Sequence, residues 1–296
     1  MAYRLLGSAA DAEDAVQEAY LRLGTSAPPD LADRRAWLTT VVSRLCLDLL
    51  RSARWRRETY VGTWLPEPLV GYDDTDLADA AALRESVRTA VLLVMETLTP
   101  AERVAFVLHD VFGMDFDRLA AVLGRSPAAC RQLASRARRR VRQDAPPRAE
   151  IAAAEQARVV DAFLRASADG DLRDLVRLLD PDVVFRSDGG GEVRAALRTV
   201  SGARKVAALL AGLRQRYGNT IAHPVRLASG AGFLLLAGDE PRAGGELPAG
   251  GELPAGGELP AGGVPIGILG FEVMAGRITE VNLVLAPSKI RRSSRG

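Results

Sequence analysis

The stretch LTPAERVAFVLHDVFGMDFDRLAAVLGRSPAACRQLASRARRRVR, residues 98–142, predicts helices separated by glycine-containing turns. Thr99 begins a TPAE motif, which supplies an N-cap, a proline at the first helical position and a capping-box glutamate. Gly124 is placed to end the helix DFDRLAAVLG, and Ser126 followed by Pro127 starts the next one. A helix, a glycine turn and a second capped helix form the pattern of a helix-turn-helix.

The last of these helices carries the strongest chemical signal. Every fourth residue from Ala129 to Val141 is apolar and predicts a core-facing stripe, Ala129, Leu133, Ala137 and Val141. Arg131 and Gln132 then lie on the exposed N-terminal part, with donors for guanine and adenine edges in a DNA major groove. The predicted DNA-contacting side chains are Ser126, Pro127, Arg131, Gln132, Ser135, Arg136, Arg138 and Arg139. A solvated basic face is the alternative, but turn, cap and charge together favour phosphate binding.

Residues 1–60 read as helical, starting from the S-x-x-D sequence at Ser8. One apolar stripe is predicted from Ala15, Val16, Ala19, Tyr20 and Leu23. The polar remainder is acidic and favours a protein partner over DNA: Asp11, Glu13, Asp14, Gln17 and Glu18. Further on, flat rings accompany cations, a combination suited to unstacked single strands: Trp37, Arg51, Arg54, Trp55, Arg56 and Arg57. Trp37 also begins an apolar stripe, so a core role for it is equally open.

The second half of the chain has a different character. Two helical stretches precede the strand DVVFRSD and three glycines from Gly189; a further helix and four strand-like runs follow. This order predicts an α+β domain with helices on a curved antiparallel sheet. Within it, the repeated AGGELP sequence at 243–260 reads as a disordered loop insertion.

Composition limits the remaining possibilities. A chain of 296 residues with a net charge of +2 fits two or three globular domains. Cys46 and Cys130 sit in apolar helical patterns and read as buried thiols. The sequence shows no metal-ligand spacing and no nucleotide-binding glycine loop, so we expect no metal and no cofactor. It also shows no apolar run long enough to span a membrane, so we expect no membrane association and a cytoplasmic location.

Taken together, these segments resemble a sigma-70 factor of the extracytoplasmic-function group. YRLLGSAADAEDAVQEAYLRL and AWLTTVVSRLCLDLLRSARWRRETYVGTWLPEPL are similar to the domain that binds core RNA polymerase and the promoter −10 element. Residues 98–142 are similar to the −35-binding domain. TWLPEPL, SDGGGEV and the tail are similar to family members with a fused SnoaL-like (NTF2-like) cone-shaped domain.

The resemblance implies a multidomain organisation of two all-α sigma domains and an α+β tail. Region 2 is expected at 1–60, a linker at 61–84, region 4 at 85–143, a second linker at 144–154, and the SnoaL-like domain at 155–290 with an insertion at 243–263. It also implies partners: promoter DNA and core RNA polymerase. The acidic residues at 11–18 would face the β′ clamp helices, and Leu98 to Phe112 would help present region 4 to the β flap. The loop from Ser26 to Arg35 would hold an extruded −10 base.

Some features depart from the family pattern. Met1 falls inside the usual first helix, which we interpret as a misassigned start, with a truncated factor as the alternative. APSKI (286–290) stands where Asn-Pro-Asp-Lys-Leu is usual, which weakens the expectation that this segment docks. The AGGELP expansion is not expected of the family.

Two other functions are open from sequence. One is a SnoaL-like isomerase or hydrolase fused to a DNA-binding domain, with Asp188 or His223 as the acid or base. Against it, no partner that would tune either pKa is visible in the sequence, and the neighbouring glycines indicate a tight turn at Asp188. The other is a repressor whose tail binds an unidentified small ligand, which leaves the acidic helix and residues 37–60 without a role.

TWLPEPL (63–69) joins the two predicted DNA-binding domains. Its two prolines favour a stiff, extended spacer, and its apolar side chains need a surface to cover them. The tail is the predicted surface. The contact is expected to involve Trp64, Leu65, Pro66, Glu67, Pro68 and Leu69 with Asp188, Gly189 and Gly190.

Overall fold

The computed structural model describes residues 1–28, 31–58, 63–70, 89–144, 153–216, 220–227, 230–237 and 264–293. The chain forms two compact units. The N-terminal unit comprises Met1–Tyr60 and Asp76–Pro147, and the C-terminal unit comprises Val61–Thr75 and Arg148–Gly296. The linker segment, residues 63–70, therefore packs as part of the C-terminal unit.

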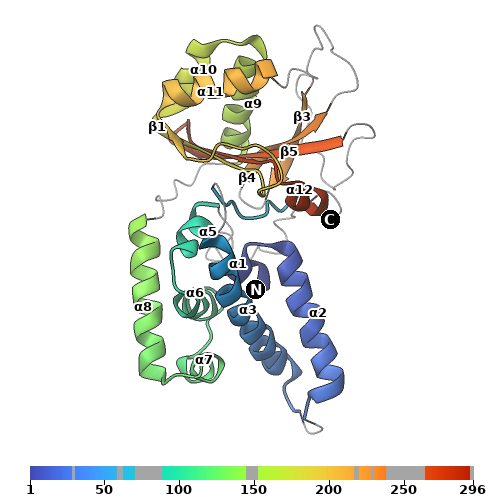
Figure 1. Cartoon of the computed structure of the whole chain (residues 1–296). Helices are drawn as coiled ribbons and strands as arrows, with labels where there is room; N and C mark the ends of the chain where they lie inside the picture. Colours follow the sequence, from blue (N-terminus) through green and yellow to red (C-terminus); the bar gives the residue numbers. More distant parts are fainter. Residues whose placement is uncertain are drawn as a thin grey trace. The chain divides into compact units, whose positions relative to one another are not determined.

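The described part of the N-terminal unit is helical (Figure 1). Its elements are α1 (Ala2–Leu6), α2 (Ala9–Ser26), α3 (Arg34–Glu58), α5 (Thr89–Glu96), α6 (Pro100–Phe106), the π-helical turn η2 (Val107–Val111), α7 (Phe116–Leu123) and α8 (Pro127–Asp144). The predicted caps are confirmed. The Ser8 side chain accepts from the Asp11 amide at the start of α2, and Thr99 and Glu102 form a complete capping box at the start of α6.

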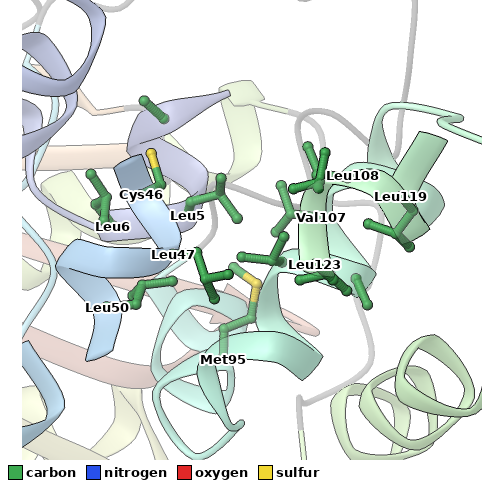
Figure 2. Packing of buried hydrophobic residues seen from close by; sticks show 14 of the residues in the cluster. Leu5, Leu6, Cys46, Leu47, Leu50, Met95, Val107, Leu108, Leu119 and Leu123 are labelled. Atoms are coloured by element: carbon green, nitrogen blue, oxygen red, sulfur yellow. The ribbon is translucent and has the colours of Figure 1, made fainter. Parts of the chain in front are cut away.

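One apolar core holds these helices together (Figure 2). Leu47 and Leu50 of α3 belong to the same buried cluster as Met95 of α5 and Val107 of η2. A polar contact adds to this packing between α3 and α7, because the Arg44 side chain donates to the Ala121 carbonyl at 2.8 Å. The helices expected in regions 2 and 4 thus share one core, and the boundaries 1–60 and 85–143 stay predictions.

The C-terminal unit is built on a six-stranded sheet of order β2-β1-β6-β5-β4-β3. The strands are β1 (Leu179–Asp188), β2 (Val200–Ser201), β3 (Thr220–Leu227), β4 (Gly230–Ala237), β5 (Val264–Met274) and β6 (Arg277–Val284). The α+β prediction is confirmed, but the expectation of a wholly antiparallel sheet is wrong, because β1 runs parallel to β6. The long connection between these strands, which includes helix α11 and the four strands β2 to β5, permits the parallel pairing.

Helices α9 (Ala153–Asp169), α10 (Leu172–Leu178) and α11 (Ala203–Arg216) cover one face of this sheet (Figure 1). Between α9 and the strands, Phe163 meets Phe271 with ring centroids 5.0 Å apart, and Phe233 meets Phe271 at 5.8 Å, both edge-on. Edge-on aromatic pairs of this kind add to the burial energy of a core. A short helix, α12 (Pro287–Ser293), follows β6 and packs against β5.

Candidate nucleic-acid interface and linker seat

The predicted helix-turn-helix is present as α7, a glycine turn and α8. Asp115 caps α7 by accepting from the Arg118 amide at 2.8 Å, and Gly124 ends it in the left-handed conformation, φ 63°. The Ser126 hydroxyl then accepts from the Ala129 amide at 3.2 Å, and α8 starts at Pro127. Each boundary therefore has a local chemical cause, and the sequence predicted two of them, the end of α7 at Gly124 and the start of α8 at Ser126 and Pro127.

Helix α8 has a buried face and a basic exposed face. The predicted stripe is partly confirmed: Leu133 and Ala137 are buried, whereas Ala129 and Val141 are half-buried. Cys130 and Ala134 complete the core-facing side. The exposed side includes most of the predicted DNA contacts, namely Ser126, Arg131, Gln132, Ser135, Arg136 and Arg139, while Pro127 and Arg138 are half-buried.

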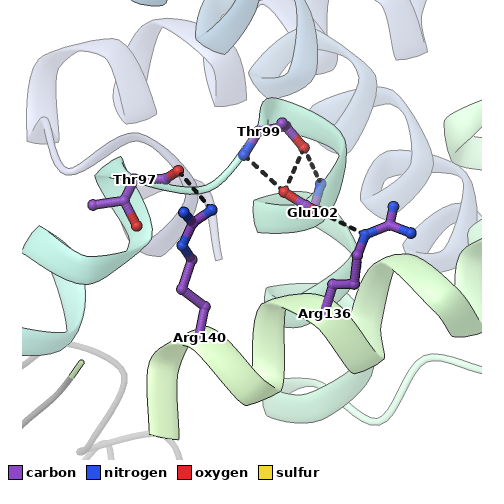
Figure 3. Close-up of polar contacts among 5 residues, drawn as sticks. All are labelled: Thr97, Thr99, Glu102, Arg136 and Arg140. Carbon is purple, nitrogen blue, oxygen red and sulfur yellow. Dashed lines mark hydrogen bonds and ion pairs between the residues drawn. The ribbon is translucent and has the colours of Figure 1, made fainter. Parts of the chain in front are cut away.

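Several α8 arginines are engaged within the N-terminal unit (Figure 3). Arg136 Nε lies 2.9 Å from a Glu102 carboxylate oxygen, and Arg140 donates to the Thr97 carbonyl at 3.5 Å. Arg138 pairs with Asp110 of η2 at 2.5 Å. Desolvation alone would raise the pKa of Glu102, but hydrogen bonds from Arg136 and Thr99 outweigh it and hold that pKa below its ordinary value. These contacts fasten α8 to the helices beneath it.

Arg131 has a different environment. Its guanidinium carbon lies 5.4 Å from the centroid of the Phe116 ring, within cation–π range. The Phe116 ring in turn lies against His109, with centroids 3.9 Å apart. The imidazole of His109 is held by a 2.8 Å hydrogen bond between Nδ1 and the Met114 carbonyl. Arg131 is thus seated on a ring that is itself held in place.

The predicted −10 residues lie on α3, and only some of their side chains are described. Trp37 is half-buried near the start of α3, where Asp33 caps the helix through the Ala36 amide at 2.8 Å. Arg51 is exposed and pairs with Asp48 at 3.3 Å. The remaining predictions fall on side chains outside the described ones: Arg54, Trp55, Arg56 and Arg57.

Helix α2 corrects the predicted apolar stripe. Ala15 and Ala19 are buried and Leu23 is half-buried, but Val16 is 36% exposed and Tyr20 61%. Leu21, which was not part of the predicted stripe, is 66% exposed. These three exposed apolar side chains share the outer surface of α2 with predicted polymerase-contacting residues: Glu13, Asp14 and Gln17 are exposed, and Asp11 and Glu18 are half-exposed. The stripe was misassigned because the small side chains of Ala12, Ala15 and Ala19 form the core-facing side of α2, and the larger side chains of Val16 and Tyr20 lie on the exposed side.

In the C-terminal unit, the linker segment is bound by its backbone. The Leu65 amide donates to Asp188 Oδ2 at 2.8 Å, and Lys289 Nζ donates to the Leu65 carbonyl. Lys289 also pairs with Asp188 Oδ2 at 2.7 Å and lies 4.5 Å from the centroid of the Trp64 ring. Leu65, Pro66 and Glu67 are buried. We call Asp188, Gly190 and Lys289 the linker seat.

The glycines after Asp188 are required by the shape of this seat, and the predicted tight turn is confirmed. The Gly190 amide donates to Asp188 Oδ1 at 2.8 Å, with Gly190 at φ +70°. A Cβ on Gly189 would lie 2.1 Å from the Val193 carbonyl oxygen. A larger residue at either position would displace the turn that orients the Asp188 carboxylate.

Lys289 is the functional residue that sequence reasoning missed. APSKI departs from the family motif, but its lysine is retained and supplies the charged partner of Asp188. The two residues are 101 positions apart, so no local pattern links them. The Asp188 carboxylate therefore has partners that were not visible in the sequence, the Leu65 amide and the Lys289 ammonium. Within the described segments, His, Cys, Asp and Glu side chains form no three-residue group suited to a metal ion.

Comparison with known proteins agrees with this architecture. Residues 1–56 match the model of Sigma-70 region 2, and residues 88–141 match Sigma-70, region 4. The chain is 53% identical over 223 residues to the ECF RNA polymerase sigma factor SigJ of Mycobacterium tuberculosis (strain ATCC 25618 / H37Rv), covering 74% of this chain and 70% of that protein. It is 40% identical over 195 residues to the probable ECF RNA polymerase sigma factor SigI of Mycobacterium tuberculosis (strain CDC 1551 / Oshkosh), covering 64% and 65%.

The similarity extends over nearly the whole fold. The crystal structure of the Mycobacterium tuberculosis extracytoplasmic function sigma factor SigJ matches with a TM-score of 0.72 and 40% sequence identity, covering 99% of this chain and 94% of that one. The chain belongs to the extracytoplasmic-function RNA polymerase sigma factors of the sigma-70 family. It is thus an alternative sigma factor, as the sequence predicted. In the part of the chain with described structure, we find no helix with the length and hydropathy of a membrane span.

Proposed function

We propose that the C-terminal unit regulates this sigma factor by holding the linker segment in the linker seat. The observation that carries the proposal is the capture of both backbone groups of Leu65, by Asp188 and by Lys289. The segment lies in sequence between the region 2 and region 4 matches, at 1–56 and 88–141. Fixing it would restrict the distance and orientation that the two DNA-binding regions adopt.

The chemistry of the seat supports a stable grip. Charge-assisted hydrogen bonds are about twice as strong as neutral ones, and the bonds that hold Leu65 involve a carboxylate and an ammonium. The Asp188 side chain is fully buried and that of Lys289 is 15% exposed, so solvent screens their attraction weakly. Pro66 and Pro68 reduce the conformational freedom that the linker segment loses when it binds.

The DNA contacts follow from the exposed side of α8. We infer that Arg131 and Gln132 read base edges of the −35 element and that Arg139 contacts phosphate. Trp37 and the arginines from Arg51 to Arg57 would lie at the opened −10 strand.

The polymerase contacts are proposed for α2. Val16, Tyr20 and Leu21 add an exposed apolar surface to its acidic side chains. This mixture of aromatic, apolar and charged groups is typical of a protein-binding surface. The β′ clamp helices are the proposed partner there, and the β flap is the proposed partner of region 4. These roles place the protein in the cytoplasm.

The linker proposal is tested with Trp64→Ala and the matched variant Trp64→Phe. Trp64→Ala removes the ring beside Lys289, so we expect faster proteolytic cleavage in residues 63–70 and altered promoter-specific transcription with purified core polymerase. Trp64→Phe keeps a ring and should behave more like the wild type. If Trp64→Ala changes neither cleavage nor transcription, the C-terminal unit does not regulate this sigma factor through the contact of Trp64 with Lys289.

A further inference from the structure

The six arginines of α8 differ in what they contact. Arg136 and Arg138 face carboxylates of the N-terminal unit at 2.9 and 2.5 Å, through Glu102 and Asp110. Arg139 and Arg142 are exposed, and neither forms an ion pair with any of the residues whose side chains are described. A charge already balanced by a carboxylate contributes less to phosphate neutralisation than an unbalanced one.

Arg131 belongs to neither group, because among the described side chains it lies over the Phe116 ring and forms no ion pair with a carboxylate. Phe116 occupies the first position of α7, directly after the capping residue Asp115. The ring is half-buried against the apolar core and lies 3.9 Å, centroid to centroid, from His109. A ring fixed on these sides has little freedom of its own, so it limits the directions available to the guanidinium resting 5.4 Å from its centroid.

We propose that Phe116 is the positioning residue for base readout by Arg131. The ring preorders a long side chain and leaves its planar set of donors uncommitted. Bidentate recognition of guanine needs this geometry, and an arginine already ordered loses less freedom on binding. Arg136 and Arg138 instead form ion pairs that hold α8 against the N-terminal unit. Arg139 and Arg142 make most of the phosphate contacts.

This inference rests on the proposed −35 role of Arg131. The experiment uses core polymerase loaded with the full chain and a library of promoters randomised across the −35 element. It compares Phe116→Leu, Phe116→Tyr and Arg131→Ala, and the combination of Phe116→Leu with Arg131→Ala. Phe116→Leu keeps apolar bulk in the core and removes the ring, whereas Phe116→Tyr keeps the ring.

Phe116→Leu is expected to reduce discrimination about two- to fivefold at the base position that Arg131→Ala relaxes, the range of an exposed cation–π contact. Phe116→Tyr keeps the ring and should retain the wild-type discrimination at that base position. In the Arg131→Ala background, Phe116→Leu should have no further effect on that position. A general weakening of the fold would instead lower binding to all sequences and persist in that background.

Two control variants distinguish an arginine that contacts phosphate from one that stabilises α8 through an ion pair. Arg139→Ala should weaken binding to all sequences and make the dependence on salt shallower by about one unit of slope. Arg136→Ala should change that slope less than Arg139→Ala and lower the midpoint of thermal unfolding. Equal salt-dependence slopes for the two variants would refute the division between arginines that stabilise α8 and arginines that contact phosphate.

Failure of the inference is distinguishable from failure of the proposed function. If Arg131→Ala leaves the sequence preference unchanged, Arg131 does not read bases and both are wrong. If Arg131→Ala relaxes one position but Phe116→Leu does not, readout by Arg131 stands and positioning by Phe116 is refuted.

Discussion

Removing the Lys289 ammonium tests how strongly Lys289 and Asp188 interact within the linker seat. Lys289→Met keeps the length and apolar part of the side chain and removes the ammonium that pairs with the Asp188 carboxylate, which has no exposed side-chain surface. Breaking a buried ion pair from one side typically costs about 3–5 kcal/mol, because the remaining buried charge loses the attraction that offset its desolvation. The Leu65 and Gly190 amides still donate to Asp188, so we expect a value of about 3 kcal/mol, at the lower end of that range.

The double-mutant cycle with Asp188→Asn gives the interaction itself. Because the double variant removes both charges, its loss of unfolding free energy should be smaller than the sum of the single losses by at least about 1 kcal/mol. The assay is urea unfolding of the full chain, followed by a probe in the C-terminal unit so that its transition is resolved. Hydrogen exchange of the Leu65 amide gives a second, local readout, and its protection should fall in Asp188→Asn.

A matched control comes from the same sheet. Arg186 pairs with Glu280 at 2.9 Å, with side chains 22% and 11% exposed. Glu280→Gln should lower the stability of the C-terminal unit and leave exchange of the Leu65 amide protected. Additive losses in the Asp188–Lys289 cycle, or equal exchange at Leu65 in Asp188→Asn and Glu280→Gln, would refute the reasoning about the seat.

Three further predictions concern the N-terminal unit. Thr99→Ala should cost about 0.5–2 kcal/mol of unfolding free energy, since it removes the N-cap. Because the folded-state pKa of Glu102 is held below its ordinary value of 4.5, its charged contacts stabilise the fold above that pH and are lost as the pH falls through the lowered pKa. The stability difference between wild type and Glu102→Gln should therefore shrink on acidification below pH 4.5, and a difference that is constant from pH 7 to pH 3 would contradict this. Burial raises the pKa of the Cys46 thiol to about 12 and also raises that of Cys130, so neither should react with iodoacetamide at pH 8 until urea unfolds the chain; rapid native labelling, followed by mass spectrometry, would show the thiols to be accessible.

Local signals explain most of what the sequence predicted. The capping box at Thr99, the glycine at 124 and the serine cap at 126 depend on residues within a few positions, and each appears in the structure. The glycine turn after Asp188 was predicted for the same reason, because a run of glycines indicates a backbone that side chains would obstruct. Such features are encoded by neighbours along the chain.

Long-range partners explain most of what the sequence did not predict. The two contacts of Asp188 with Leu65 and Lys289 span 123 and 101 residues, and they depend on a fold that periodicity does not specify. The contacts of Arg136 and Arg138 with acidic side chains 34 and 28 residues away were likewise not visible in the sequence, and their predicted contact with DNA stays a prediction. On α2, both faces contain apolar residues, so spacing alone did not distinguish buried Ala19 from exposed Tyr20.

The central claim is that the C-terminal unit constrains the linker and thereby the geometry of promoter binding. It is tested most directly by transcription with purified core polymerase on promoters whose −10 to −35 spacing changes one base pair at a time. Wild-type protein should show a sharp optimum, and Asp188→Asn should give a lower and broader profile, because a released linker samples more end-to-end distances. An Asp188→Asn profile with the same optimum, width and height as the wild type would contradict the account.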